Sequence, residues 1–242
     1  SCQYRVGLTG TLDGSKTHKL VLEGVFGSVN KVISTNILQE REQLAQLKIY
    51  CLVLQHTNIK CRFDYREEMD YLVHHKGRNK YIRNLCVSLR GNTLCLFQFV
   101  EKHGKDLREL IAEKAKGKKV FYVHGGVDTD EREYIRQITE KSDNAIIIAS
   151  YGTFSTGINI RNLHNIVFSS PSKSRIRNLQ SIGRGLRLKD NNSDATLYDI
   201  SDNMTYNGVT NYTLRHFEER LNIYKEEKFK YEIHKVEIKD ER

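Results

Sequence analysis

The sequence lacks the features of a membrane or secreted protein. No apolar run approaches the roughly 18 residues that a transmembrane helix needs. The first five residues, Ser1–Arg5, lack the apolar core of a signal peptide and read as the middle of a strand. We therefore expect no membrane partner, and we expect the sequence as given to begin inside a longer chain.

A disulfide or zinc framework is also missing. The five cysteines show no Cys-x-x-Cys pair and no metal-ligand spacing: Cys2, Cys51, Cys61, Cys86 and Cys95. An odd number without pairing favours buried thiols in a reducing cytoplasm. The single proline, Pro171, argues against long extended linkers.

No catalytic cluster is evident from spacing, since no Ser-His-Asp or Cys-His arrangement can be found. His74 and His75 are adjacent and cannot share one helix face, so we interpret both as surface residues. Asp199 and Asp202 could form a carboxylate pair, but we interpret them as caps at the end of a strand. We predict no metal site.

Positive charge is what the chain has in excess. It carries 39 Lys and Arg against 30 Asp and Glu, a formal net charge of +9. A polyanion such as nucleic acid is the simplest partner for such a chain. A basic protein without such a partner would have the same composition, so composition leaves both alternatives open.

Strand-like and helix-like segments alternate along the chain. This pattern predicts an α/β fold with a parallel sheet covered by helices on both faces. The predicted strands span 31–33, 47–54, 93–99, 119–123, 145–149, 165–169 and 195–199. The predicted helices span 15–27, 35–43, 64–73, 78–88, 101–116, 128–141, 173–182 and 210–227. The alternating run at 229–234 predicts an edge strand or a hairpin arm.

Three predicted loops at the carboxyl ends of strands offer hydroxyls, backbone amides or basic groups: His124–Gly126, Ser150–Ile160 and Ser170–Arg175. Ligands of open parallel sheets bind at this edge. Small hydroxyl residues and exposed amides suit sugar-phosphate contacts. Ordinary turns use the same residues, but three such loops at one edge of a basic protein favour binding.

The segment Gln180–Arg187 carries Arg184 and Arg187, which lie three apart on one helical face. Gly183 directly before the first arginine allows close approach to a phosphate group. We interpret the segment as an arginine clamp for a nucleotide whose main binding loop is not in this chain.

The stretch Gly10–Thr17 imitates a phosphate-binding P-loop, which would make the chain a complete enzyme using Lys16. That motif requires glycine directly before the lysine. Ser15 stands there instead, and the glycine spacing is short by one. We therefore favour a strand-end loop followed by a helix.

Residues 94–187 resemble the second RecA-like domain of superfamily-two helicases. The similar segments follow one another in the family's order: Leu94–Phe99 for motif IV, Val123–Gly126 with Glu131 and Arg132 for the next motif, Ala149–Ile160 for motif V and Gln180–Arg187 for motif VI. Leu8–Leu12 resembles motif III, which ends the first RecA-like domain.

This resemblance implies roles in ATP chemistry. Arg187 would be the arginine finger and Arg184 a second γ-phosphate contact. Gln180 would orient the nucleotide or the attacking water. Gly157 and Asn159 would lie near the ribose or the domain interface, although many relatives carry aspartate at the position of Asn159.

The resemblance also implies a nucleic-acid track and a coupling element. The track would be lined by residues from the strand-end loops: Gln98, His124, Gly125, Ser150, Tyr151 and Thr153. Thr9 and Thr11 would couple the nucleotide state to closure of the two domains.

Over its whole length the chain resembles the carboxyl-terminal half of phage recombination helicases. This implies a remnant of the first RecA-like domain at 1–34, a second RecA-like domain at 35–228 and a carboxyl-terminal strand or tail at 229–242. The implied cofactor is ATP with Mg, bound mainly by the first domain. The implied partners are that domain and DNA or RNA–DNA hybrids, in the cytoplasm of an infected bacterium. A non-enzymatic nucleic-acid-binding module stays open as the alternative.

Overall fold

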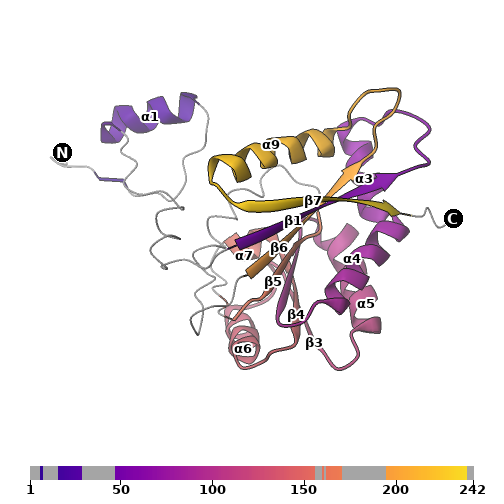
Figure 1. The fold of residues 1–242 in the computed structure, drawn as a ribbon. Helices are drawn as coiled ribbons and strands as arrows, with labels where there is room; N and C mark the ends of the chain where they lie inside the picture. The colour runs from indigo at the N-terminus through magenta and orange to yellow at the C-terminus, as the bar shows by residue number, and fades with distance from the viewer. Residues whose placement is uncertain are drawn as a thin grey trace.

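The structure, a computed structural model, describes residues 6–7, 16–28, 47–155, 160, 162–170 and 195–238. In this part of the chain seven strands form one sheet in the order β3-β4-β2-β5-β6-β1-β7 (Figure 1). The strands are β1 (Leu47–His56), β2 (Thr93–Phe97), β3 (Lys119–Val123), β4 (Ala145–Ser150), β5 (Asn165–Phe168), β6 (Ala195–Asn203) and β7 (Lys230–Ile238). Every neighbouring pair is parallel. The predicted parallel α/β fold is therefore confirmed, and all carboxyl ends of the strands meet at one edge.

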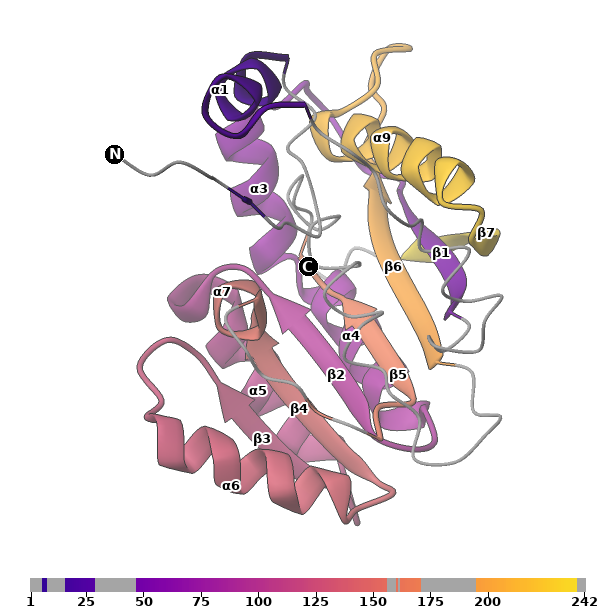
Figure 2. The ribbon, with the colours of Figure 1, turned by 90° about the vertical axis from the view of Figure 1, so that its left-hand side faces the viewer.

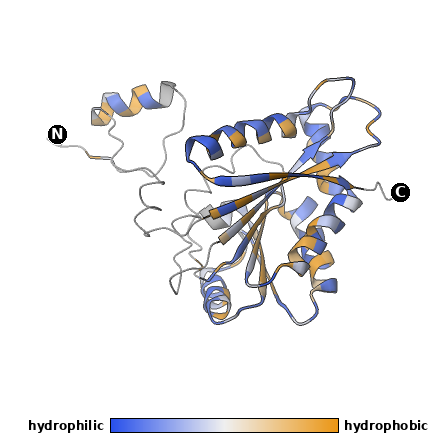
Figure 3. Cartoon of the chain, viewed as in Figure 1, coloured by the Kyte–Doolittle hydropathy of each residue, from blue (hydrophilic) through white to orange (hydrophobic). Residues whose placement is uncertain are grey.

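Helices cover both faces of the sheet (Figure 2). Helices α4 (Lys76–Ser88) and α5 (Lys105–Lys114) pack on one face, and α6 (Thr129–Glu140) and α9 (Tyr212–Glu226) pack on the other. Successive residues of β2 and β4 face opposite layers and are all buried. This burial explains their continuous apolar runs. Hydrophobic residues accordingly follow the strands in Figure 3.

The described part also contains three further α-helices: α1 (Lys16–Phe26), α3 (Tyr65–His74) and α7 (Tyr151–Ser155). Asp128 caps α6, because its carboxylate accepts a hydrogen bond from the Glu131 backbone N–H at 2.8 Å. The elements predicted at 31–33, 35–43 and 173–182 lie outside the described residues.

Strand β6 is longer than predicted, and our interpretation of Asp199 and Asp202 as strand-end caps is wrong. Both lie within β6 and are 0% exposed. Asp199 pairs with Arg220 of α9, and Asp202 pairs with Arg78 of α4. Each buried carboxylate is neutralised by an arginine from a helix on one face of the sheet. The strand can therefore continue through both aspartates.

Strand β7 pairs in parallel with β1 at the end of the sheet. The edge-strand alternative for the last segment is thus confirmed, and the hairpin-arm alternative is wrong. The segment joins the same sheet as the preceding strands.

Two predictions about surface and burial need correction. His74 is exposed as expected, but His75 is buried, and its Nδ1 accepts the Arg78 backbone N–H at 3.0 Å to cap α4. Among the described cysteines, Cys51, Cys86 and Cys95 are buried as expected, whereas Cys61 is exposed.

The helix predicted from residue 101 begins instead with a π-helical turn, Val100–Gly104. Its wide turn is closed by the Gly104 N–H, which donates to the Phe99 carbonyl at 2.8 Å. Gly104 also lies directly against the Phe97 ring, where an added Cβ would come within 2.5 Å of a ring carbon. Sequence periodicity cannot reveal this turn, because it depends on a contact with the preceding strand.

Replacing Gly104 with alanine should therefore lower the free energy of unfolding by about 1–3 kcal/mol, a typical cost of overpacking. Urea titration of the variant and the parent protein would measure the difference. Gly152→Ala is the matched control, since an added Cβ there meets nothing within 4 Å. Equal stability of the two variants would contradict this account of the turn.

Candidate nucleic-acid and nucleotide site

The carboxyl edge of the sheet brings together the loops after β2, β3, β4 and β5. The predicted nucleic-acid residues in the described part all lie in or beside these loops: Gln98, His124, Gly125, Ser150, Tyr151 and Thr153. The other predicted site residues lie outside the described residues: Thr9, Thr11, Gly157, Asn159, Gln180, Arg184 and Arg187.

The loop after β3 is a tight turn with exposed backbone. The His124 Nδ1 accepts the Gly126 N–H at 3.1 Å, and the Arg132 guanidinium donates to the Gly125 carbonyl at 3.2 Å. Arg132, which lies in α6, therefore holds this turn in place. Gly125 and Gly126 are exposed, and an added Cβ at Gly125 would meet nothing within 4 Å. A phosphate group can approach such a backbone closely.

The segment after β4, predicted as a loop from Ser150, begins instead with helix α7, and two hydroxyls hold the start of this helix. The Ser150 and Thr153 hydroxyl oxygens lie 2.7 Å apart, and both residues are buried. The Tyr151 ring packs edge-on against Phe168 of β5, with ring centroids 5.8 Å apart. Gly152 between them is exposed. These side chains thus fix the start of α7 and leave Gly152 exposed to solvent.

The loops after β2 and β5 are joined by one hydrogen bond. The Gln98 backbone N–H donates to the Ser170 hydroxyl at 3.0 Å. Gln98 is exposed to solvent, whereas Ser170 is buried, with 0% of its surface exposed. A predicted nucleic-acid contact, Gln98, is therefore hydrogen-bonded to the second residue after β5.

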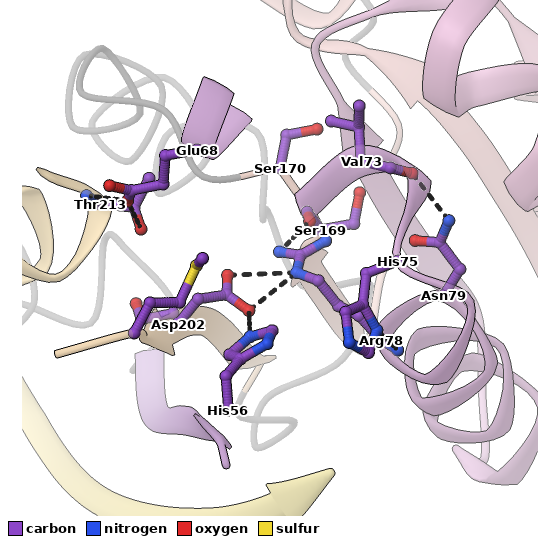
Figure 4. Close-up of polar contacts among 12 residues, drawn as sticks. His56, Glu68, Val73, His75, Arg78, Asn79, Ser169, Ser170, Asp202 and Thr213 are labelled. Carbon is purple, nitrogen blue, oxygen red and sulfur yellow. Dashed lines mark hydrogen bonds and ion pairs between the residues drawn. The ribbon is translucent and has the colours of Figure 1, made fainter. Parts of the chain in front are cut away.

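A buried ionic cluster that the sequence did not reveal lies beneath these loops (Figure 4). Arg78 Nε donates to both Asp202 carboxylate oxygens, at 2.9 and 3.1 Å, and Arg78 Nη2 donates to the Ser169 carbonyl at 2.8 Å. His56 Nε2 lies 3.0 Å from Asp202 Oδ1. Burial alone would raise the pKa of the Asp202 carboxyl, but the charge of Arg78 and the hydrogen bond from His56 hold that pKa well below its usual range.

A second buried carboxylate connects α3 to α9. Glu68 is 1% exposed and accepts hydrogen bonds from the backbone N–H groups of Tyr212 and Thr213 at 2.9 and 2.7 Å. These N–H groups belong to the first turn of α9, where a helix favours negative charge. Glu68 thus fixes the start of α9 against α3.

Two kinds of feature are absent from the described part of the chain. No group of three or more His, Cys, Asp or Glu side chains is arranged to hold a metal ion. No described helix is both long enough and apolar enough to cross a membrane.

Known proteins are similar to this chain in sequence and in fold. Residues 77–189 match the family model "Helicase conserved C-terminal domain". The chain is also 34% identical, over 256 aligned residues, to the ATP-dependent DNA helicase uvsW of Enterobacteria phage T4. The chain contains the carboxyl-terminal domain of a superfamily-two helicase.

The match to the phage helicase covers 98% of this chain and 50% of its relative. The crystal structure of T4 UvsW superimposes with a TM-score of 0.68 and 33% identity, covering 88% of this chain and 44% of that one. The chain thus spans about half the length of these relatives.

The helicase fold extends to more distant structures. The ATP-dependent Type ISP restriction-modification enzyme LlaBIII bound to DNA matches with a TM-score of 0.59 and 13% identity, covering 89% of this chain and 17% of that one. At this identity the likeness concerns the fold alone. The helicase family model spans all four segments, between residues 94 and 187, that resembled motifs IV to VI.

Proposed function

We propose that this domain is the second motor domain of an ATP-dependent helicase or translocase that remodels branched DNA or RNA–DNA hybrids. The observation that carries the proposal is the 34% identity to an ATP-dependent DNA helicase over 98% of the chain. The exposed turns at one edge of a parallel sheet, in a chain of net charge +9, support nucleic acid as the partner.

In this proposal the domain supplies half of an ATP site. Arg187 and Arg184 face the γ-phosphate and stabilise the charge on the transferring phosphoryl group, and Gln180 orients the nucleotide or the attacking water. Gly157 and Asn159 lie near the ribose or the domain interface. As the similarity to an ATP-dependent helicase suggests, a first motor domain would bind ATP and its metal ion.

The same proposal assigns the nucleic-acid track to the loops at the carboxyl edge. Gly125 and Gly152 offer exposed backbone to phosphates, and Gln98 offers an exposed side chain. His124, Ser150, Tyr151 and Thr153 hold these loops in shape. Contacts of this kind position a strand without reading its sequence.

Residues 1–34 are proposed to belong to the first motor domain. Helix α1 lies in this range, and its apolar side chains Leu20 and Phe26 are 67% and 46% exposed. The rest of a first domain would cover them. Thr9 and Thr11 would then couple the nucleotide state to domain closure.

The 242-residue chain on its own should bind nucleic acid weakly and hydrolyse essentially no ATP. Its affinity should fall steeply with salt, because binding releases counterions from the phosphate backbone. Fluorescence anisotropy with a labelled DNA fork at several salt concentrations, beside a phosphate-release assay, tests both statements. DNA-stimulated ATP turnover by this chain alone would disprove the proposal that the chain supplies only half of an ATP site.

The alternative is a non-enzymatic module whose arginines only contact phosphates. The net charge of +9 is the observation that favours it. It requires that the full-length protein shows no role for ATP. ATP-dependent strand separation by the full-length protein would exclude this alternative.

A further inference from the structure

Ser170 occupies a junction between two parts of the proposed motor. Its hydroxyl accepts the Gln98 N–H at 3.0 Å, and Gln98 is a proposed nucleic-acid contact. In sequence, Ser170 stands ten residues before Gln180, where the segment with Arg184 and Arg187 begins. A single buried hydroxyl therefore links the β2 loop to the chain that leads to the proposed ATP contacts.

The Ser170 hydroxyl is itself held by a buried histidine. His103 Nδ1 lies 3.1 Å from the Ser170 hydroxyl oxygen, and His103 Nε2 lies 3.1 Å from Asn79 Oδ1. His103, Ser170 and Asn79 are 0%, 0% and 3% exposed. His103 belongs to the π-helical turn Val100–Gly104, and such turns often mark functional positions.

The donor and acceptor of each hydrogen bond in this series can be assigned, starting from Asn79. The Asn79 amide nitrogen donates to the Val73 carbonyl at 2.8 Å (Figure 4). The Asn79 amide oxygen is therefore the atom that contacts His103 Nε2. A neutral His103 then donates from Nε2 and accepts at Nδ1. The Ser170 hydroxyl donates to that Nδ1 and accepts from the Gln98 N–H.

We propose that Ser170 and His103 are positioning residues that couple nucleic-acid binding to ATP turnover; this rests on the proposed function above. Nucleic acid bound at the Gln98 loop orders the β2 loop. The hydrogen bonds pass this order to Ser170, from which the sequence continues to Arg184 and Arg187. Buried hydrogen bonds in series suit this role, because each fixes the next.

The neighbouring serine provides a matched control. The Ser169 hydroxyl is equally buried, and it donates to the Leu96 carbonyl at 2.7 Å within the sheet. Ser169→Ala therefore removes one buried hydroxyl bond of the same kind. It leaves the link from Ser170 to Gln98 and His103 in place.

The experiment compares Ser170→Ala with Ser169→Ala in the full-length protein. ATP turnover is measured without DNA and with saturating forked DNA, and thermal unfolding shows that both variants fold. Ser170→Ala should lower the stimulation by DNA about fivefold or more, the lower end of typical coupling between sites. Basal turnover should fall less than DNA-stimulated turnover in Ser170→Ala, and Ser169→Ala should keep the full stimulation.

Affinity provides a second readout, because coupling between two binding sites is reciprocal. A non-hydrolysable ATP analogue should change the Kd for forked DNA less in Ser170→Ala than in the parent. Equal stimulation in both variants, or an equal loss of basal and stimulated turnover in Ser170→Ala, would overturn the coupling alone. A parent protein with no DNA-stimulated turnover would overturn the proposed function and the coupling with it.

Discussion

In the full-length protein, replacing Arg187 with alanine is expected to lower ATP turnover by about a hundredfold or more, a threshold below the roughly thousandfold or larger effect of typical arginine fingers. The reason is electrostatic. The negative charge on the transferring phosphoryl group loses a cation that acts across the cleft between the two motor domains. DNA binding should stay largely intact, because the proposed track uses other residues. A phosphate-release assay and anisotropy with forked DNA measure the two properties separately.

The matched control is Arg136→Ala in α6. Arg136 forms ion pairs with Glu133 and Glu140 on the surface of the helix, and such pairs contribute little to stability. This variant should keep both ATP turnover and DNA binding. Equal loss of turnover and DNA binding in Arg187→Ala would show that the substitution unfolds the domain, and unchanged turnover would refute the arginine finger.

Much of the fold could be predicted from the sequence because burial on both faces leaves a local signal. Strand β4 reads Ala-Ile-Ile-Ile-Ala-Ser, and all six residues are buried. Continuous apolar runs of this length, separated by helical periodicity, indicate a parallel sheet. The exposed glycine turn at Gly125 could be located for the same reason, since it directly follows a recognisable strand.

The buried polar contacts could not be predicted, because each depends on a partner far away in the sequence. Arg78 and Asp202 are 124 residues apart, and Gln98 and Ser170 are 72 residues apart. In the sequence Arg78 reads as a charged residue at the start of a helix. Only the topology of the sheet brings α4 beside the ends of β5 and β6.

Replacing Asp202 with asparagine should lower the free energy of unfolding by about 3–5 kcal/mol at neutral pH, the usual cost of breaking a buried ion pair. Asparagine keeps the shape of the side chain but removes its charge. The Arg78 side chain is 0% exposed, so its charge would be left buried without a counterion. Urea titration of the variant and the parent would measure the loss.

Asp70→Asn is the matched control. Asp70 pairs with Lys102 at 2.8 Å, but these side chains are 53% and 60% exposed, and such pairs contribute about 0–1 kcal/mol. The same substitution should therefore have a small effect at Asp70 and a large one at Asp202. Similar losses in the two variants would contradict the importance of burial.

The effect of Asp202→Asn should also depend on pH. The pKa of the Asp202 carboxyl is depressed in the folded protein, whereas an unfolded aspartate titrates near about pH 3.9. The stabilisation by this carboxylate is therefore fully present above that pH and is lost as the pH falls below it. The difference in unfolding free energy between the parent and Asp202→Asn should thus be constant from neutral pH down to about pH 5 and shrink below about pH 4. A difference that stays constant to lower pH would show that the lost stability does not come from the ionised carboxylate.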